Sequence, residues 1–183
     1  MGVLTRLVAL LVFASVPLDG DADLLSEPEA KAAVLYNLAT YTTWPESRSS
    51  RPELLIGVAG PDPVLEALAS VNGRQVQGRM IRVREIRPED DPRGCDILYV
   101  PGTFPRTHSL LRSLQGTPVL TVGDTETARH GGAAVRVFFE RSRLRLEIEL
   151  TLLERAHVRI SSKVLSLARV LRNGHVVTNS SRP

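Results

Sequence analysis

Few side chains in this sequence are placed where they could carry out chemistry. The four histidines, His108, His130, His157 and His175, occur singly and not in pairs at metal-ligand spacing. The sequence also has no nucleophilic serine elbow and no glycine-rich phosphate loop. These features favour a protein that is not an enzyme and that needs no metal or other cofactor.

The single cysteine, Cys95, excludes an internal disulfide. It has no histidine near it in the sequence and directly precedes a predicted buried strand. Two interpretations remain open. Cys95 is either a small buried hydrophobe or, in an oxidising compartment, one half of an intermolecular disulfide.

A small group of cations lies near the end of the chain. Arg169 and Arg172 are three residues apart and would share one face of a helix predicted over residues 162–171, with His175 just beyond it. Such a group could bind an anion or an aromatic ligand, which would make the protein a receptor for an amino acid or a nucleotide. The same cations also complement the dipole at the C-terminus of a helix.

Charged and apolar residues alternate from residue 141 to residue 150. Arginine and glutamate occupy one face of this segment, and leucine and isoleucine occupy the other. The alternation predicts an antiparallel hairpin over residues 133–150 that turns near residues 140–142. Charge pairs across its strands would stabilise the hairpin and protect the sheet edge, so no catalytic carboxylate pair is needed to explain them.

The elements that would position these residues predict an α/β fold. A capping box at Ser26 and Glu29 starts a helix that runs to about residue 42, and Trp44-Pro45 stops it. Residues 46–52 read as a polar loop, and further helices are expected over residues 151–157 and 162–171. Short strands and helices alternate between them, over residues 54–59, 62–70, 79–86, 96–100, 105–115, 119–122 and 126–129. The prediction is a three-layer sandwich with a mixed, partly parallel sheet and a C-terminal antiparallel hairpin.

The chain of 183 residues, 43% of them hydrophobic, suits one folded domain. Arg6 precedes an apolar run over residues 7–16, whose helical length of about 15 Å is half of a bilayer core. We therefore expect a cleavable signal peptide over residues 1–22, with an uncleaved anchor as the alternative. The domain would span residues 23–177, followed by a disordered tail over residues 178–183. The formal net charge of +3 is spread among acidic neighbours, and an exported chain of this kind is not expected to bind nucleic acid.

Several segments, taken in order, resemble the YfiR family of bacterial periplasmic proteins. These segments are Lys31 to Ala39 with Trp44-Pro45, Leu55 to Gly60, Cys95 to Val100, Gly131-Gly132, Leu144 to Ile148, and Ser161 to Ala168. The resemblance covers about residues 29–172. The sequence departs from the family pattern at Glu149, where asparagine is usual, and in having one cysteine, so the disulfide control of the founding member does not transfer.

The resemblance implies a periplasmic repressor that binds the periplasmic sensor domain of an inner-membrane enzyme, a YfiN-like diguanylate cyclase. Repression would lower cyclic-di-GMP and biofilm formation. It also implies a homodimer and an outer-membrane lipoprotein as a further partner. Tyr36, Tyr41 and Trp44, on the first helix and its exit, are candidate aromatic anchors for the partner. Packing of these rings against the sheet is the alternative.

Overall fold

The computed structural model describes residues 25–177 of the chain. The predicted signal peptide over residues 1–22 and the predicted tail over residues 178–183 lie outside the described residues. Residues 23 and 24 of the predicted domain lie outside them as well. The α-helices are α1 (Glu27–Tyr41), α2 (Glu46–Ser49), α3 (Pro63–Ala67), α4 (Thr107–Ser113), α5 (Glu126–Gly131), α6 (Leu150–Arg155) and α7 (Ser162–Leu165). Two 3-10 turns, η1 (Leu68–Val71) and η2 (Pro92–Gly94), accompany them.

The strands build one large sheet and one small one. The strands are β1 (Thr42–Thr43), β2 (Glu53–Ala59), β3 (Gln75–Val76), β4 (Arg79–Ile86), β5 (Ile97–Val100), β6 (Leu120–Gly123), β7 (Val135–Glu140), β8 (Arg143–Glu149), β9 (Arg159–Ile160), β10 (Arg169–Arg172) and β11 (His175–Val176). The large sheet has the order β11-β10-β8-β7-β6-β5-β2-β4-β3, and β1 pairs with β9 separately.

Five neighbouring strands of the large sheet, β4, β2, β5, β6 and β7, run parallel. Numbered along the chain, their order is 2-1-3-4-5, the order of flavodoxin-like doubly wound sheets. The flanking pairs β3–β4, β7–β8 and β10–β11 are antiparallel. The predicted mixed, partly parallel sheet is therefore confirmed, and so is the hairpin over residues 133–150, which is β7–β8.

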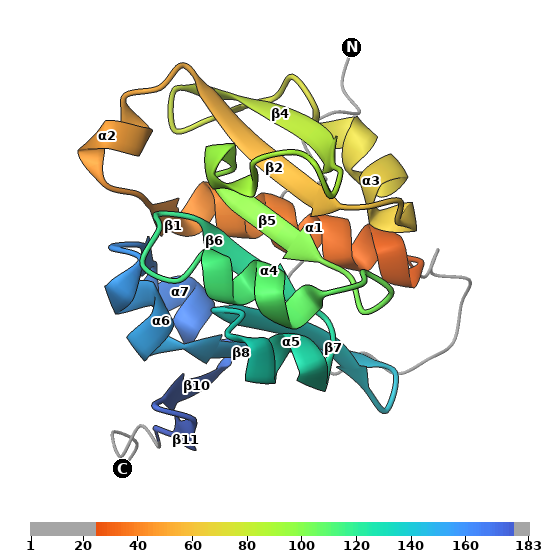
Figure 1. Ribbon diagram of the computed structural model, residues 1–183, viewed down its shortest axis with the longest axis vertical. Coiled ribbons are helices and arrows are strands. Elements are labelled where there is room, and N and C mark those ends of the chain that lie inside the picture. Colours follow the sequence, from red (N-terminus) through yellow and green to blue (C-terminus); the bar gives the residue numbers. More distant parts are fainter. Residues whose placement is uncertain (1–24, 178–183) are drawn as a thin grey trace, which may run out of the picture.

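The sheet separates two apolar cores, which gives the predicted three layers. One core packs β-strand residues against α1, α3 and α7, and the other packs them against α4 and α5. Figure 1 shows α4 and α5 in front of the sheet and α1 behind it. No helix among residues 25–177 is long and apolar enough to cross a membrane.

The start of α1 follows from its sequence. The Ser26 hydroxyl accepts a hydrogen bond from the Glu29 backbone N–H, and the Glu29 carboxylate accepts one from the Ser26 backbone N–H at 2.8 Å. This capping box satisfies donors that a helix N-terminus otherwise leaves unpaired. The helix ends at Tyr41, where the backbone becomes extended at Thr42.

Two local predictions are wrong. Residues 46–52 are not only loop, because Glu46–Ser49 form α2. The helix predicted over residues 162–171 ends at Leu165, and Arg169–Arg172 instead form β10, which pairs in parallel with β8. Without β10, β8 would be an open sheet edge, so pairing with β8 decides the conformation of residues 169–172.

Candidate functional site

The three candidate aromatic anchors have different environments. Trp44 is 4% exposed, and its indole N–H donates a hydrogen bond to the Asp96 carbonyl oxygen at 3.1 Å. Tyr36 is half-buried against the core beside the guanidinium of Arg74. Tyr41 is the most accessible of the three, at 37%. In this conformation a partner can therefore reach Tyr36 and Tyr41, whereas Trp44 is enclosed.

The exit of α1 is joined to α7 by the small β1–β9 sheet, in which Thr42 lies opposite Ile160. The backbone N–H of Ser161 donates to the Tyr41 carbonyl oxygen at 2.8 Å. The Lys163 ammonium group lies 6.0 Å from the centre of the Tyr41 ring. We refer to Tyr41 and Lys163 as the α1–α7 surface. Tyr36, five residues earlier on α1, points about 140° away from Tyr41 around the helix axis and lies beside Arg74 instead.

The structure separates the three candidate ligand-binding cations. Arg169 and Arg172 do not share a helix face, because both lie on β10, where side chains three apart point to opposite sides. Arg169 binds Glu147 at 3.0 Å and Arg172 binds Glu154 at 2.8 Å. Only Arg172 and His175 are brought together, as cross-strand partners of β10–β11.

Cys95 is a free, fully buried thiol. Burial raises its pKa to about 12, which keeps it protonated and unreactive. A Cβ atom at Gly57 would lie 2.6 Å from the Cys95 sulfur, which accounts for a glycine inside β2. Of the two interpretations of Cys95, the buried hydrophobe is the one that this environment fits.

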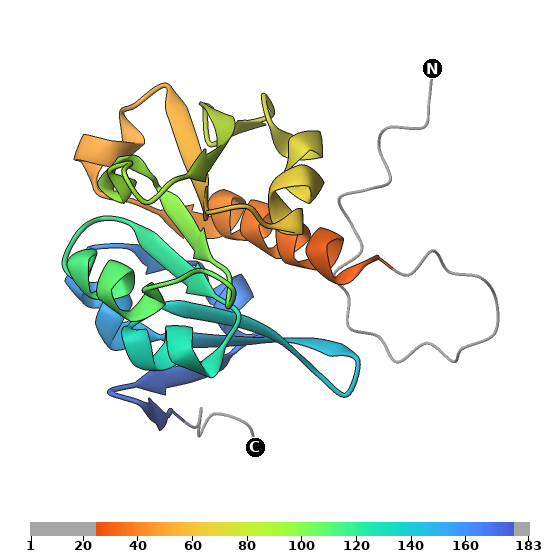
Figure 2. The same cartoon turned by 45° about the vertical axis from the view of Figure 1, so that its right-hand side comes forward.

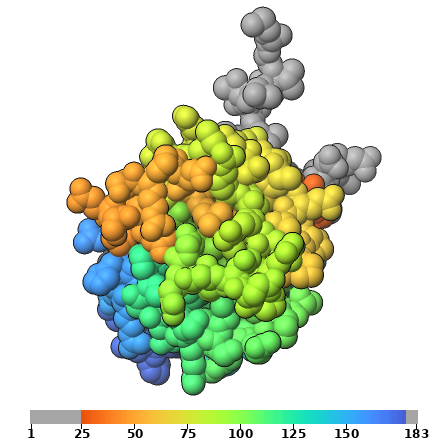
Figure 3. All heavy atoms as spheres, turned by 45° about the horizontal axis from the view of Figure 1, so that its top comes forward, coloured from red at the N-terminus to blue at the C-terminus, as the bar shows by residue number. Residues whose placement is uncertain are grey.

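A buried charge cluster lies where the parallel strands begin. The Asp96 carboxylate accepts hydrogen bonds from the Arg79 guanidinium and from the Leu55 backbone N–H, both at 2.8 Å. Arg48 lies 4.0 Å from the other Asp96 oxygen and donates to the carbonyl oxygens of residues 93–95. In Figure 3 the α2 segment, in orange, accordingly packs against the yellow-green chain. This cluster holds α2 in place.

A second polar cluster lies where the same strands end. The Asp124 carboxylate accepts hydrogen bonds from the Tyr99 hydroxyl at 2.7 Å and from the Lys31 ammonium at 2.8 Å. Lys31 also pairs with Glu27 at 2.7 Å. Burial opposes the charge of Lys31, but these two carboxylates outweigh it and raise its pKa. Burial and the bond to Asp124 raise the pKa of Tyr99, so the cluster anchors α1 to the sheet with Tyr99 neutral.

The ends of parallel strands are a common ligand site in doubly wound sheets, but here their charged groups are engaged with one another. Sequence spacing did not identify Lys31, Arg48, Arg79 or Asp124. The one available signal was Asp96 directly before an apolar strand, since a buried carboxylate requires a cationic partner.

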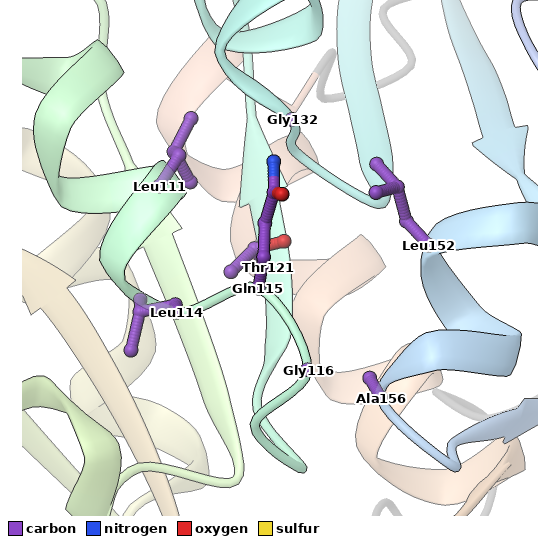
Figure 4. Close-up of a pocket in the computed structure, with 8 residues that line it drawn as sticks. All are labelled: Leu111, Leu114, Gln115, Gly116, Thr121, Gly132, Leu152 and Ala156. Atoms are coloured by element: carbon purple, nitrogen blue, oxygen red, sulfur yellow. The ribbon is translucent and has the colours of Figure 1, made fainter.

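A small cleft lies between α4 and α6, lined by Leu111, Leu114, Gln115, Leu152 and Ala156 (Figure 4). Its volume of about 10 Å³ is close to what one water molecule occupies. An amino acid or a nucleotide does not fit there in this conformation. Among residues 25–177 no three His, Cys, Asp or Glu side chains are grouped so that they could hold a metal ion.

The model of the YfiR/HmsC-like family matches residues 28–169, which is more than half of the chain and nearly all of the described fold. The chain belongs to this family. It is a regulatory family, not a catalytic one, and its context is diguanylate cyclase signalling. The matched region of this YfiR-like chain includes the buried charge cluster around Asp96, the α1–α7 surface, and the polar cluster around Asp124 except for Glu27. It ends at Arg169, before Arg172 and His175.

Proposed function

We propose that this YfiR-like chain is an exported regulator that works in the periplasm after loss of residues 1–22. It binds the periplasmic sensor domain of an inner-membrane signalling enzyme, a diguanylate cyclase, and represses it, which lowers cyclic-di-GMP and biofilm formation. The observation that carries the proposal is the family match over residues 28–169.

The chemistry of the interior supports binding and not turnover. Asp96 and Asp124 are engaged by cations and backbone or hydroxyl donors. Tyr99 and Cys95 have raised pKa values and stay protonated near neutral pH. Groups held in this way stabilise one arrangement of the fold and are poorly suited to act as nucleophiles or general bases.

Repression of this kind requires a difference in affinity between two states of the partner. A protein that binds the inactive state 100-fold more tightly than the active one shifts the equilibrium by about 2.7 kcal/mol, whereas equal affinity shifts nothing. The rigid three-layer fold suits this role, because it presents one fixed surface for the partner to match.

The contact surface in this proposal is the α1–α7 surface. Tyr41 supplies the accessible aromatic ring, and the Lys163 ammonium group adds charge beside it. Tyr36 adds a half-buried ring further along α1. Aromatic side chains provide large contact areas at low entropic cost, which makes them frequent anchors of interfaces. Trp44 does not contact the partner in this proposal. It holds the exit of α1 in place through the hydrogen bond from its indole N–H to the Asp96 carbonyl oxygen. The active form is a homodimer, and an outer-membrane lipoprotein competes with the cyclase for it.

Affinity purification of the tagged mature protein from a membrane extract tests the proposal. We expect an inner-membrane sensor protein with a cyclase module to be retained, and the purified protein to lower cyclic-di-GMP synthesis by that cyclase. Tyr41→Ala should reduce the retention about tenfold or more. Val176→Ala, which truncates a 58% exposed side chain on β11 at the far edge of the sheet, is the matched control. If no membrane sensor is retained by the wild-type protein, the proposal is wrong.

A further inference from the structure

The β7–β8 hairpin continues beyond the sheet that it belongs to. Strand β6 pairs with β7 only up to Arg136, and β10 pairs with β8 only from Glu147 onward. Between these limits, the residues of β7 and β8 pair only with one another within the described part of the chain. Figure 2 shows the resulting two-stranded arm in cyan, projecting from the body on the side where α1 begins.

The end of this arm, residues 139–145, is called here the hairpin tip, and it combines apolar and cationic side chains. Phe139 is 38% exposed and lies opposite Leu144, which is half-buried and packs with its inner side against the main core. Arg141, Arg143 and Arg145 are all exposed, against one acidic residue, Glu140. Glu140 pairs with Arg145 at 3.3 Å. No carboxylate among the described residues lies within 4 Å of Arg141 or Arg143.

The turn of the hairpin tip has an unfavourable sequence for its backbone. Arg141 and Ser142 have φ angles of 50° and 59°. A two-residue turn with both φ angles positive strongly favours Asn-Gly, because side chains with a Cβ atom are strained there. Residues that break a local rule are concentrated at functional sites. The turn thus has an arginine and a serine at positions where asparagine and glycine would close the same hairpin with less strain.

We propose that the hairpin tip is a docking arm for an acidic surface with an apolar depression on the partner protein. Phe139 and Leu144 contact the depression, and Arg141 and Arg143 pair with carboxylates around it. The charge of the tip selects the partner, since its cations outnumber its carboxylate. Arg141 and Arg143 form no ion pair within residues 25–177, and Glu140, which lies opposite Arg143, pairs with Arg145 instead. This inference rests on the proposed function, because the partner is the same sensor domain.

The test measures the affinity of the purified mature protein for the sensor domain retained in the purification above, at low and at moderate salt. R141E/R143E reverses both free charges and is expected to weaken binding at least 100-fold at low salt. R141N/S142G removes one charge while giving the turn its preferred residues, and should weaken binding about tenfold. S142G keeps Arg141 and is the matched control, with affinity equal to that of the wild type. Salt should weaken wild-type binding more than binding by R141E/R143E.

The outcomes separate the two proposals. If the wild-type protein binds the sensor domain and R141E/R143E binds equally well with the same salt dependence, the docking arm is wrong and the proposed function stands. The arginines would then serve only to keep the arm from pairing with other sheet edges, which increased aggregation of the uncharged variant R141Q/R143Q would show. If the wild-type protein binds no sensor domain, the proposed function fails and the docking arm fails with it. Thermal unfolding of each variant establishes that a loss of binding is not a loss of fold.

Discussion

The inner and outer halves of the β7–β8 hairpin use the same residue types in opposite ways. In the inner half, Arg136 lies opposite Glu147 and contacts its carboxylate with two nitrogens, at 2.8 and 2.7 Å. Arg169 binds the other Glu147 oxygen at 3.0 Å, and Arg136 also binds Glu126. In the outer half, Arg145 is the one arginine that forms a salt bridge within residues 25–177, with Glu140. Arginine is structural where the sheet continues on both sides and is accessible where the hairpin projects alone.

Burial explains why the two halves differ. Glu147 is 5% exposed and Arg136 is 9% exposed, so each needs its partner to offset the cost of leaving water. The Arg136 guanidinium also lies 3.8 Å from the centre of the Phe138 ring, which completes its enclosure. The exposed arginines of the outer half remain hydrated and need no partner within the fold. Their side chains can be exchanged without disturbing the core, so function can determine their identity.

The largest change in the free energy of unfolding is expected when the buried ion pairs of the inner half are broken. Glu147→Gln leaves Arg136 and Arg169 facing a neutral amide in a buried position, and should lower the free energy of unfolding by about 3 kcal/mol. Glu140→Gln makes the same chemical change in the outer half, where the pair is exposed, and should cost less than about 0.5 kcal/mol. Urea denaturation of the two variants provides the measurement. Equal losses would contradict the division of the hairpin into two halves.

Substitutions at the turn of the hairpin should instead raise the free energy of unfolding. Ser142→Gly relieves the positive φ of Ser142 and is expected to raise the free energy of unfolding by about 1 kcal/mol. R141N/S142G should raise it further, because Asn-Gly is the preferred pair. Gly132→Ala is the control inside the fold: the φ of Gly132 is 98°, and an added Cβ would lie 2.7 Å from the Gln115 amide nitrogen. It should be destabilising by more than about 1 kcal/mol.

Periodicity was sufficient to predict the layers and most elements of the fold. The capping box of α1, the buried strands and the β7–β8 hairpin all leave local signals, because burial of one face imposes a period of two or 3.6 residues. Residues 162–171 carried a helical spacing, yet β10 forms there because the edge of β8 accepts it. The strand conformation of residues 169–172 depends on pairing with β8, which lies about 20 residues earlier in the chain. A local sequence pattern does not contain this information.

The candidate sites were harder to predict than the fold. The sequence left open whether the three aromatic rings are accessible or packed against the sheet, and the enclosure of Trp44 depends on Asp96, which lies 52 residues away in the sequence. Similarly, Lys31 meets Asp124 only because α1 crosses behind β6. Long-range pairs of this kind leave no spacing to recognise. The alternating Arg and Glu of β8 predicted charge pairs, but not that Glu147 is buried while Arg143 is exposed.

The smallest effect on the free energy of unfolding is expected at the base of the hairpin, and this effect should depend on pH. Glu149 follows the inner half and accepts hydrogen bonds from the backbone N–H groups of Gly174 at 2.8 Å and Asn173 at 2.9 Å, and from Thr151 at 3.1 Å. Partial burial opposes its charge, but these bonds outweigh it and hold the pKa of Glu149 below 4.5. A lowered pKa means that its contribution is fully present above pH 4.5 and is lost as the pH falls through the folded-state pKa.

Glu149→Gln should therefore be less stable than the wild type at pH 7, by less than about 1 kcal/mol because the carboxylate is partly solvated. The two unfolding free energies should converge as the pH falls below 4.5, since protonation then removes the same charge from the wild-type protein. Urea denaturation between pH 7 and pH 3 measures this. A difference that stays constant over the whole range would mean that the role of Glu149 does not depend on its charge.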